Sequence, residues 1–243
     1  MEAYEALASY YNTLIEYPYD AVADICRGAS AGKKALDLFC GTGNFTFRLA
    51  ERGFDAQGSD KSQAMLNVAM EKAREKGLDI VFKKENALKF SFAKPYDLIT
   101  ATSDGLNYLR SCDLNEFFSR ISKALVAGGK FVFDVSTPYK LKHKLGNNLF
   151  YEEGEDLVYF WRNSYREKEG SVKMELTFFE KTADGTYIRR EEEHKQYAHS
   201  IDEIKVLASC YDLSVEIIID IDTFGANVST SKRLLYILKK NLG

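Results

Sequence analysis

The chain is poor in the residues that form disulfides and metal sites. Its 243 residues include four cysteines, three histidines and three prolines. The cysteines are scattered and form no C-x-x-C pair, so we expect reduced thiols rather than a disulfide framework. His194 and His199 are five residues apart and have no third partner at metal-ligand spacing, so no metal site is predicted.

A strong charge of either sign and a long apolar run are also missing. The formal net charge is −3, and the chain has no basic tail and no long run of lysine and arginine, which weighs against a nucleic-acid partner. No window reaches the roughly 18 apolar residues of a membrane span, and residues 1–12 lack an apolar segment of signal-peptide length. We therefore expect a cytoplasmic protein with no membrane partner.

What the chain does have is a regular alternation of strand-like and helical patterns. Residues 1–30 predict one or two helices broken near Pro18. Strands are predicted at residues 35–39, 55–59, 79–83, 98–102 and 130–135. Helices are predicted at 44–51, at 62–76 and from a capping box at Asp113–Glu116 to Gly128-Gly129. A capping box at Ser200 opens another helix, and strands at 213–219 and 233–239 follow. This order predicts a doubly wound α/β fold with a seven-stranded, mostly parallel sheet.

The pattern changes between residues 151 and 197. Residues 156–167, 171–181 and 187–197 alternate with period two and are separated by short polar turns, which predicts a three-stranded antiparallel meander. We divide the chain into one domain, made of 1–150 and 198–243, and an inserted antiparallel β meander at 151–197. An exposed meander edge can pair subunits, so a monomer or a homodimer is expected.

The most informative stretch is the strand, glycine turn and helix start at residues 35–45. Gly41 and Gly43 let the backbone approach a ligand, and the helix N-terminus offers free N–H groups to a carboxylate. A dinucleotide fingerprint needs a glycine where this chain has Thr46. Asp37 and Asp60, each at a predicted strand end, instead suit a ligand with an ammonium group and a ribose. S-adenosylmethionine is the predicted ligand, with Asp37 on its amino group and Asp60 on its ribose hydroxyls.

Each of these residues also has a simpler interpretation. The glycine turn can exist without a ligand, and Asp60 can cap the following helix. Met65 is predicted to lie near the adenine or to pack in the core. The side-chain oxygen of Asn86 and the N–H of Ala87 are predicted to meet the adenine, or else to belong to a polar turn.

The loop after the fourth strand lies at the sheet edge where cofactor and substrate must meet. Asp104, Asn107 and Tyr108 supply polar groups there that can orient a substrate. The loop lacks the (Asn/Asp)-Pro-Pro-(Tyr/Phe) sequence of enzymes that methylate base amino groups. His194 can act as a base if the meander covers the site, or it can be a surface histidine among glutamates. Asp104, Tyr108 and His194 are the candidate catalytic residues.

Together these motifs resemble the class I S-adenosylmethionine-dependent methyltransferases over essentially the whole chain. Residues 37–43 resemble the family's first motif, 58–66 its second, 97–102 its fourth-strand motif and 128–134 its fifth. Tyr10 and Tyr11, the 104–108 loop and the meander are similar to a small-molecule subgroup that includes sugar-amine N,N-dimethyltransferases. That resemblance implies a Rossmann-like fold, a substrate pocket partly formed by the meander, and an aromatic cofactor contact near the N-terminus.

The predicted cofactor-binding residues are Tyr11, Tyr19, Asp37, Phe39, Gly41, Thr42, Gly43, Asp60, Lys61, Met65, Asn86, Ala87 and Thr102.

Two positions depart from the family pattern: Asn86 and Asn12 stand where aspartate is usual. Residues 37–45 also resemble RNA uracil-5 methyltransferases, but the Asp-Pro-Pro-Arg loop and catalytic cysteine of those enzymes are missing. The sequence therefore predicts methyl transfer to N or O of a small-molecule metabolite. The alternatives are methylation of RNA or protein, a non-catalytic S-adenosylmethionine-binding module, and a nicotinamide dehydrogenase, which Thr46 disfavours.

Overall fold

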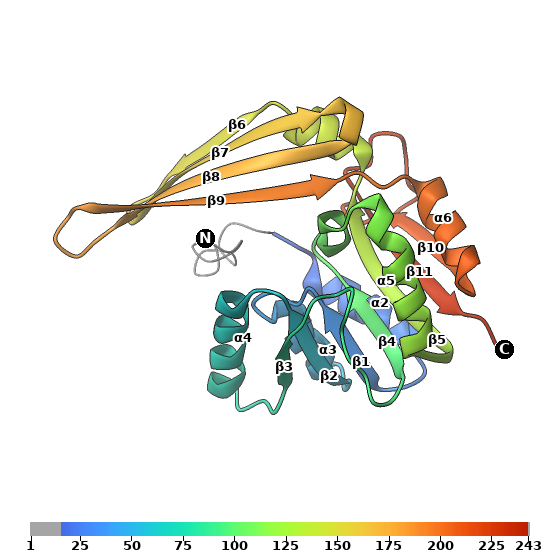
Figure 1. Cartoon of the computed structure of the whole chain (residues 1–243). Coiled ribbons are helices and arrows are strands. Elements are labelled where there is room, and N and C mark those ends of the chain that lie inside the picture. Colours follow the sequence, from blue (N-terminus) through green and yellow to red (C-terminus); the bar gives the residue numbers. More distant parts are fainter. Residues whose placement is uncertain (1–15, 243) are drawn as a thin grey trace.

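The larger of two sheets carries the predicted doubly wound architecture. The computed structural model describes residues 16–242, and its seven-stranded sheet has the order β10-β11-β5-β4-β1-β2-β3 (Figure 1). The parallel strands are β1 (Lys34–Leu38), β2 (Asp55–Asp60), β3 (Val81–Lys84), β4 (Tyr96–Ala101) and β5 (Leu125–Ser136). β10 (Leu213–Asp220) and β11 (Arg233–Lys240) follow, and β11 runs antiparallel to both of its neighbours. The mostly parallel seven-stranded sheet is confirmed.

Helices cover both faces of this sheet because its strands are apolar on both sides. The helices are α2 (Tyr19–Ala29), α3 (Asn44–Glu51), α4 (Gln63–Glu75), α5 (Ser111–Ala124) and α6 (Ile201–Cys210). Phe131 and Phe133 of β5 pack with α5 and α6, whereas Val132 between them packs with α2 and α3. The Phe133 ring stacks on Phe131 at 4.5 Å and on Tyr236 at 4.9 Å. Such two-sided burial is typical of strands inside a doubly wound sheet.

Two predicted boundaries around α5 are wrong. The helix begins at Ser111, because Arg110 rather than Asp113 stands at its N-cap. Asp113 accepts a hydrogen bond from Arg110 Nε at 2.9 Å instead of opening the helix. Gly128 and Gly129 lie inside β5, which starts directly after the helix ends at Ala124. The predicted helix starts at Ser62 and Ser200 are confirmed, because the two serines are the N-caps of α4 and α6.

The smaller sheet has four antiparallel strands, so the predicted three-stranded meander is wrong by one strand. The strands are β6 (Leu149–Glu153), β7 (Leu157–Arg166), β8 (Ser171–Lys181) and β9 (Tyr187–Tyr197), paired in that order. Every residue of β6 is exposed, so this edge strand shows no alternation between buried and exposed positions that the sequence pattern could reveal. β6 also begins before residue 151. Whether the sheet is a domain of its own stays a prediction.

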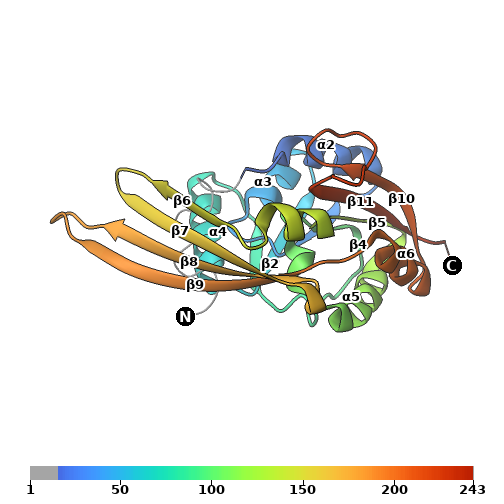
Figure 2. The ribbon, with the colours of Figure 1, turned by 90° about the horizontal axis from the view of Figure 1, so that it is seen from above.

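One face of the small sheet is buried, and it carries His194. Strand register pairs Met174 with His194 and Leu176 with Glu192, which puts these four side chains on the same face. The face packs against Leu141 of η3 (Lys140–Leu145). In Figures 1 and 2 the sheet lies over the side of the molecule where β5 ends and extends beyond the body past α4. His194 is therefore not a surface histidine; it is 4% exposed.

A buried cluster of charges joins β11, β5 and the loop after β4. Arg233 donates to both oxygens of Asp104, from Nε at 2.8 Å and from Nη2 at 2.6 Å. Lys140 Nζ lies 3.3 Å from Asp104, and Arg233 Nε lies 3.5 Å from Asp134. Burial alone raises the pKa of Asp104, but Arg233 and Lys140 hold that pKa well below its usual range. The cluster fixes the Asp104 loop onto β11.

Replacing Arg233 should strongly destabilise the fold. In Arg233→Met, Asp104 loses its bidentate partner in the interior, and we expect the free energy of unfolding to fall by about 3–5 kcal/mol. Urea denaturation measures this loss. The control is Arg74→Met, because Arg74 pairs with Glu71 on the surface and is 79% exposed in its side chain; its loss should stay below about 1 kcal/mol. Equal losses in the two variants would contradict a structural role for the cluster.

Candidate functional site

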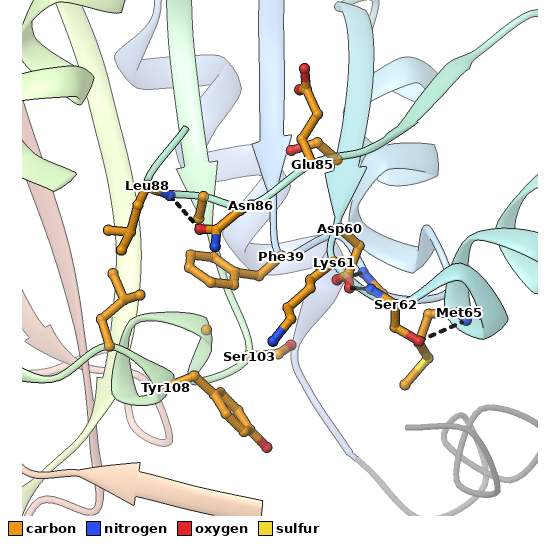
Figure 3. A pocket seen from close by; sticks show the side chains of 15 residues that line it. Phe39, Asp60, Lys61, Ser62, Met65, Glu85, Asn86, Leu88, Ser103 and Tyr108 are labelled. Atoms are coloured by element: carbon orange, nitrogen blue, oxygen red, sulfur yellow. Dashed lines mark hydrogen bonds between the residues drawn. The ribbon is translucent and has the colours of Figure 1, made fainter. Parts of the chain in front are cut away.

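The described part of the chain has a pocket at the carboxyl ends of β1 to β4 (Figure 3). Its volume is about 390 Å³. The pocket lies where the strand order reverses between β1 and β4, the position at which doubly wound sheets bind ligands. The lining residues are Phe39, Gly41, Ser59, Asp60, Lys61, Ser62, Met65, Glu85, Asn86, Ala87, Leu88, Ser103, Gly105, Tyr108 and Leu109.

The two glycines of the first loop have different surroundings. Gly41 has φ +53°, and a Cβ atom there would meet no heavy atom within 4 Å, so its backbone borders open space. Gly43 has φ +78° at the N-cap of α3, and a Cβ there would lie 3.0 Å from the Phe82 ring. Gly41 therefore lines the pocket, whereas Gly43 lies outside the pocket wall and packs against Phe82. Thr42 between them is 1% exposed and is not part of the wall.

Asp60 ties the first two loops together. Its Oδ2 accepts from the Gly41 N–H at 2.9 Å, and its Oδ1 accepts from the Ser62 N–H at 2.8 Å. Ser62 Oγ caps α4 by accepting from the Met65 N–H at 3.3 Å, so the capping alternative for Asp60 does not hold. Burial raises the pKa of Asp60. A half-buried carboxylate on the pocket wall with two ordered oxygens is suited to accept hydrogen bonds from a diol.

Asp37 lies below the pocket rather than on its wall. The carboxylate is 1% exposed and accepts from the Thr46 hydroxyl at 2.7 Å and from the Thr100 hydroxyl at 2.8 Å. Burial raises its pKa to about 7, although both hydroxyls oppose the shift. Thr46, which replaces the third glycine of a dinucleotide fingerprint, is thus a partner of Asp37. The predicted contact between Asp37 and a ligand amino group stays a prediction.

Three residues with left-handed backbone conformation lie just after β1 and β4. Phe39, Ser103 and Asp104 have φ values of 55°, 57° and 62°, a region that non-glycine residues rarely adopt. Asp134 of β5 holds two of them, because its carboxylate accepts from the Ser103 N–H at 2.8 Å and from the Asp104 N–H at 2.9 Å. Burial raises the pKa of Asp134 to about 6, against the effect of Arg233. Backbone strain held by such contacts is typical of functional sites.

The loop after β3 closes the other end of the pocket. Asn86 Oδ1 accepts from the Leu88 N–H at 2.9 Å, so this side chain orders its own turn while it lines the pocket. Met65, Leu88 and Leu109 give this wall apolar surface. Met65 is also 2% exposed, so it packs in the core while it lines the pocket, and its expected contact with the adenine stays a prediction.

Tyr108 connects the pocket to the small sheet. It ends η2 (Gly105–Tyr108), lines the pocket, and places its hydroxyl 3.4 Å from His194 Nδ1. His194 Nε2 lies 3.1 Å from Glu192 Oε2, and both side chains are buried. The structure therefore brings Tyr108 and His194 together. It does not bring the third candidate, Asp104, to the pocket, because Asp104 is bound to Arg233.

The remaining predicted residues fall into three groups. Phe39, Lys61 and Ala87 line the pocket. Tyr19 and Thr102 lie outside its wall, and Tyr11 lies outside the described residues. Among the lining residues that were not singled out from the sequence are Ser59, Ser62, Leu88, Ser103 and Leu109. Their position at or just after strand ends is the only signal that could have indicated them.

Neither metal ligation nor membrane insertion has support in residues 16–242. No cluster of three or more His, Cys, Asp or Glu side chains in that range is able to hold a metal ion. None of the helices within it has the length and apolar character needed to cross a bilayer.

Comparison with known proteins identifies the family. Residues 35–129 match the methyltransferase domain family. The chain is 35% identical to a protein of Geobacillus sp. (strain WCH70) named as a methyltransferase, over 98% of this chain and 99% of that one. This chain belongs to the S-adenosylmethionine-dependent methyltransferases.

Solved structures of methyltransferases agree with this assignment. The S-adenosylmethionine-dependent methyltransferase of Clostridium acetobutylicum ATCC 824 superposes with a TM-score of 0.88 at 29% identity, over 98% of this chain and 99% of that one. The sugar N-methyltransferase KedS8 of Streptoalloteichus sp. ATCC 53650 has the same fold, with a TM-score of 0.78 at 17% identity over 99% and 94% of the two chains.

The pocket of this methyltransferase fits S-adenosylmethionine. Gly41 leaves open space beside its backbone, Asp60 offers ordered carboxylate oxygens, and Met65 and Leu88 offer apolar surface for a flat ring. No metal or phosphate-binding group is needed for this ligand.

Removing the Asp60 carboxylate should weaken cofactor binding. In Asp60→Ala we expect the Kd for S-adenosylmethionine to rise well over tenfold, because the hydrogen bonds to a diol and to the Gly41 N–H are both lost. Titration calorimetry measures the Kd, and circular dichroism checks the fold. Asp55→Ala, at the opposite end of β2, is the control. An unchanged affinity in Asp60→Ala would refute the assignment.

The buried Asp37 carboxyl should make stability depend on pH. The unfolded chain ionises it near pH 4, whereas the folded chain does so at about pH 7. The folded state therefore holds a proton that the unfolded state has lost, and the stability from this group is present below about pH 4 and lost as pH rises through 7.

Asp37→Asn tests this dependence by urea denaturation at pH 4.5 and pH 7.5. Between those values the wild type should lose about 3 kcal/mol more than the variant. Parallel pH profiles for the two proteins would show that Asp37 does not retain its proton in the fold.

Proposed function

We propose that this methyltransferase acts on a nitrogen or oxygen atom of a small molecule held beside Tyr108. The observation that supports the proposal is the chain of side chains that runs from the pocket wall to a buried carboxylate. Tyr108 lies on the wall, His194 Nδ1 lies 3.4 Å from its hydroxyl, and Glu192 lies 3.1 Å from the other ring nitrogen.

The position of the small sheet favours a small-molecule acceptor over a macromolecule. Its buried face carries His194 and Glu192 toward the pocket residue Tyr108, so an acceptor must fit between this face and the carboxyl edge of the large sheet. KedS8, which shares the fold at 17% identity, is named for methylation of a sugar nitrogen. The net charge of −3 gives no support for a nucleic-acid acceptor.

The side chains are suited to orient the acceptor and remove its proton. The cofactor, when bound, supplies an electrophilic methyl group. The Tyr108 hydroxyl accepts a hydrogen bond from the N–H or O–H group of the acceptor and so aims its lone pair. The proton that the acceptor loses passes by way of Tyr108 to His194, and the carboxylate of Glu192 stabilises the imidazolium that forms. The same walls exclude water.

We also propose that the protein is cytoplasmic and that its partner is a small-molecule methyl acceptor. All four cysteines are free, and Cys26 and Cys40 are buried, as expected where thiols stay reduced. A monomer or a homodimer remains the expected assembly.

A labelling screen followed by two variants tests the proposal. The protein is incubated with methyl-labelled S-adenosylmethionine and fractionated metabolites, RNA or protein, and we expect label only in a small molecule. With that acceptor, Tyr108→Phe and His194→Gln should each lower kcat by about 100-fold, within the usual range for a lost acid–base group. The Kd for the cofactor should change less than threefold.

The control for these variants is Tyr159→Phe. Tyr159 is on the same small sheet, and its hydroxyl donates to Glu152 near the surface, so this change should leave kcat unaffected. Label confined to RNA or protein would refute the small-molecule acceptor. Full activity in both Tyr108→Phe and His194→Gln would refute the proton path.

A further inference from the structure

Asn107 is a fully buried amide directly next to the pocket residue Tyr108. It is 0% exposed and does not line the pocket, although its neighbours Gly105 and Tyr108 do. The sequence-based expectation that Asn107 orients a substrate is therefore not supported by its position. Its buried amide needs hydrogen-bond partners within the protein.

Those partners belong to two different sheets. Asn107 Oδ1 accepts from the Ser136 N–H at 2.8 Å, and its Nδ2 donates to the Ser136 carbonyl at 3.0 Å. The same Nδ2 donates to the Tyr197 carbonyl at 2.9 Å. Ser136 is the last residue of β5 in the large sheet, and Tyr197 is the last residue of β9 in the small sheet.

The bond to Tyr197 bears directly on the reacting side chains. Tyr197 lies three residues after His194 on the same strand, and Tyr108 follows Asn107 in η2. Tyr108 and His194 are 86 residues apart in the chain, and their contact of 3.4 Å is already long for a hydrogen bond. A shift of about 1 Å between η2 and β9 would break it, and misplacements of that size cost catalysis heavily.

A second contact joins η2 to the segment that follows β9. His199 Nε2 lies 3.3 Å from the Leu106 carbonyl, just after β9 ends. This contact is longer than the Asn107 bonds and holds only one carbonyl. Asn107 alone, among these residues, binds both strand ends with one side chain.

We propose that Asn107 is a positioning residue that sets the distance between Tyr108 and His194 by fixing the end of β9 to the end of β5. The proposal rests on the proposed function of Tyr108 and His194. Aspartate has the same shape but no N–H donors, so it keeps only the bond from the Ser136 N–H and leaves both carbonyls without a donor.

The test compares Asn107→Asp and Asn107→Ala with Asn163→Ala. Asn163 is the matched control because it is another buried asparagine, 3% exposed, whose Nδ2 donates to a carbonyl, that of Leu145. It holds β7 to η3 and has no hydrogen bond to η2 or β9 in the described structure.

The first measurement is NMR of ¹⁵N-labelled histidine rings, which needs no methyl acceptor. The chain has three histidines, so His194→Gln assigns the His194 signals. We expect both Asn107 variants to move the His194 ring signals in the same direction as Tyr108→Phe does. Asn163→Ala should leave those signals in place.

The second measurement separates kcat from cofactor binding. Both Asn107 variants should lower kcat at least tenfold with less than a threefold change in cofactor Kd, whereas Asn163→Ala should stay within twofold in both. Wild-type His194 signals in folded Asn107 variants, or a kcat loss matched by Asn163→Ala, would overturn the proposal. Full activity in both Tyr108→Phe and His194→Gln would instead refute the proposed proton path, while the ring signals still test Asn107.

Discussion

The site depends on carboxylates at or near strand ends that accept hydrogen bonds from backbone amides of the neighbouring loops. Asp60 holds Gly41 and Ser62, and Asp134 holds Ser103 and Asp104. Such charge-assisted bonds are stronger than neutral ones, and they offset the strain of left-handed residues. Burial raises the pKa of both acids. The acids that hold the loops around the pocket therefore have raised pKa values, and residues with shifted pKa values cluster at functional sites.

The contact between Tyr108 and His194 depends on a different kind of interaction. Tyr108 belongs to the loop after β4, whereas His194 belongs to the small sheet, and within residues 16–242 no strand pairing joins the two sheets. We infer that their alignment depends on individual side-chain hydrogen bonds such as those of Asn107. Under the proposed function, the large sheet holds the cofactor pocket while the small sheet supplies residues on the acceptor side.

Local patterns in the sequence were sufficient for the succession of strands and helices along the chain and for the loops that line the pocket, because each depends on residues close together in the chain. Gly41, Asp60 and Asn86 were all found from their positions after strands. The fourth strand of the small sheet was missed because all five of its residues are exposed. The partners of Asp104, Asn107 and His194 lie far away in sequence, so no local pattern could show that the first two are structural and the third buried.

The most direct test of this account is a crystal structure with S-adenosylhomocysteine bound. We predict that the carboxylate of Asp60 accepts hydrogen bonds from the ribose hydroxyls while its bonds from Gly41 and Ser62 stay in place. The sulfur atom should face Tyr108. A ligand bound elsewhere, or one whose ribose makes no contact with Asp60, would contradict the account.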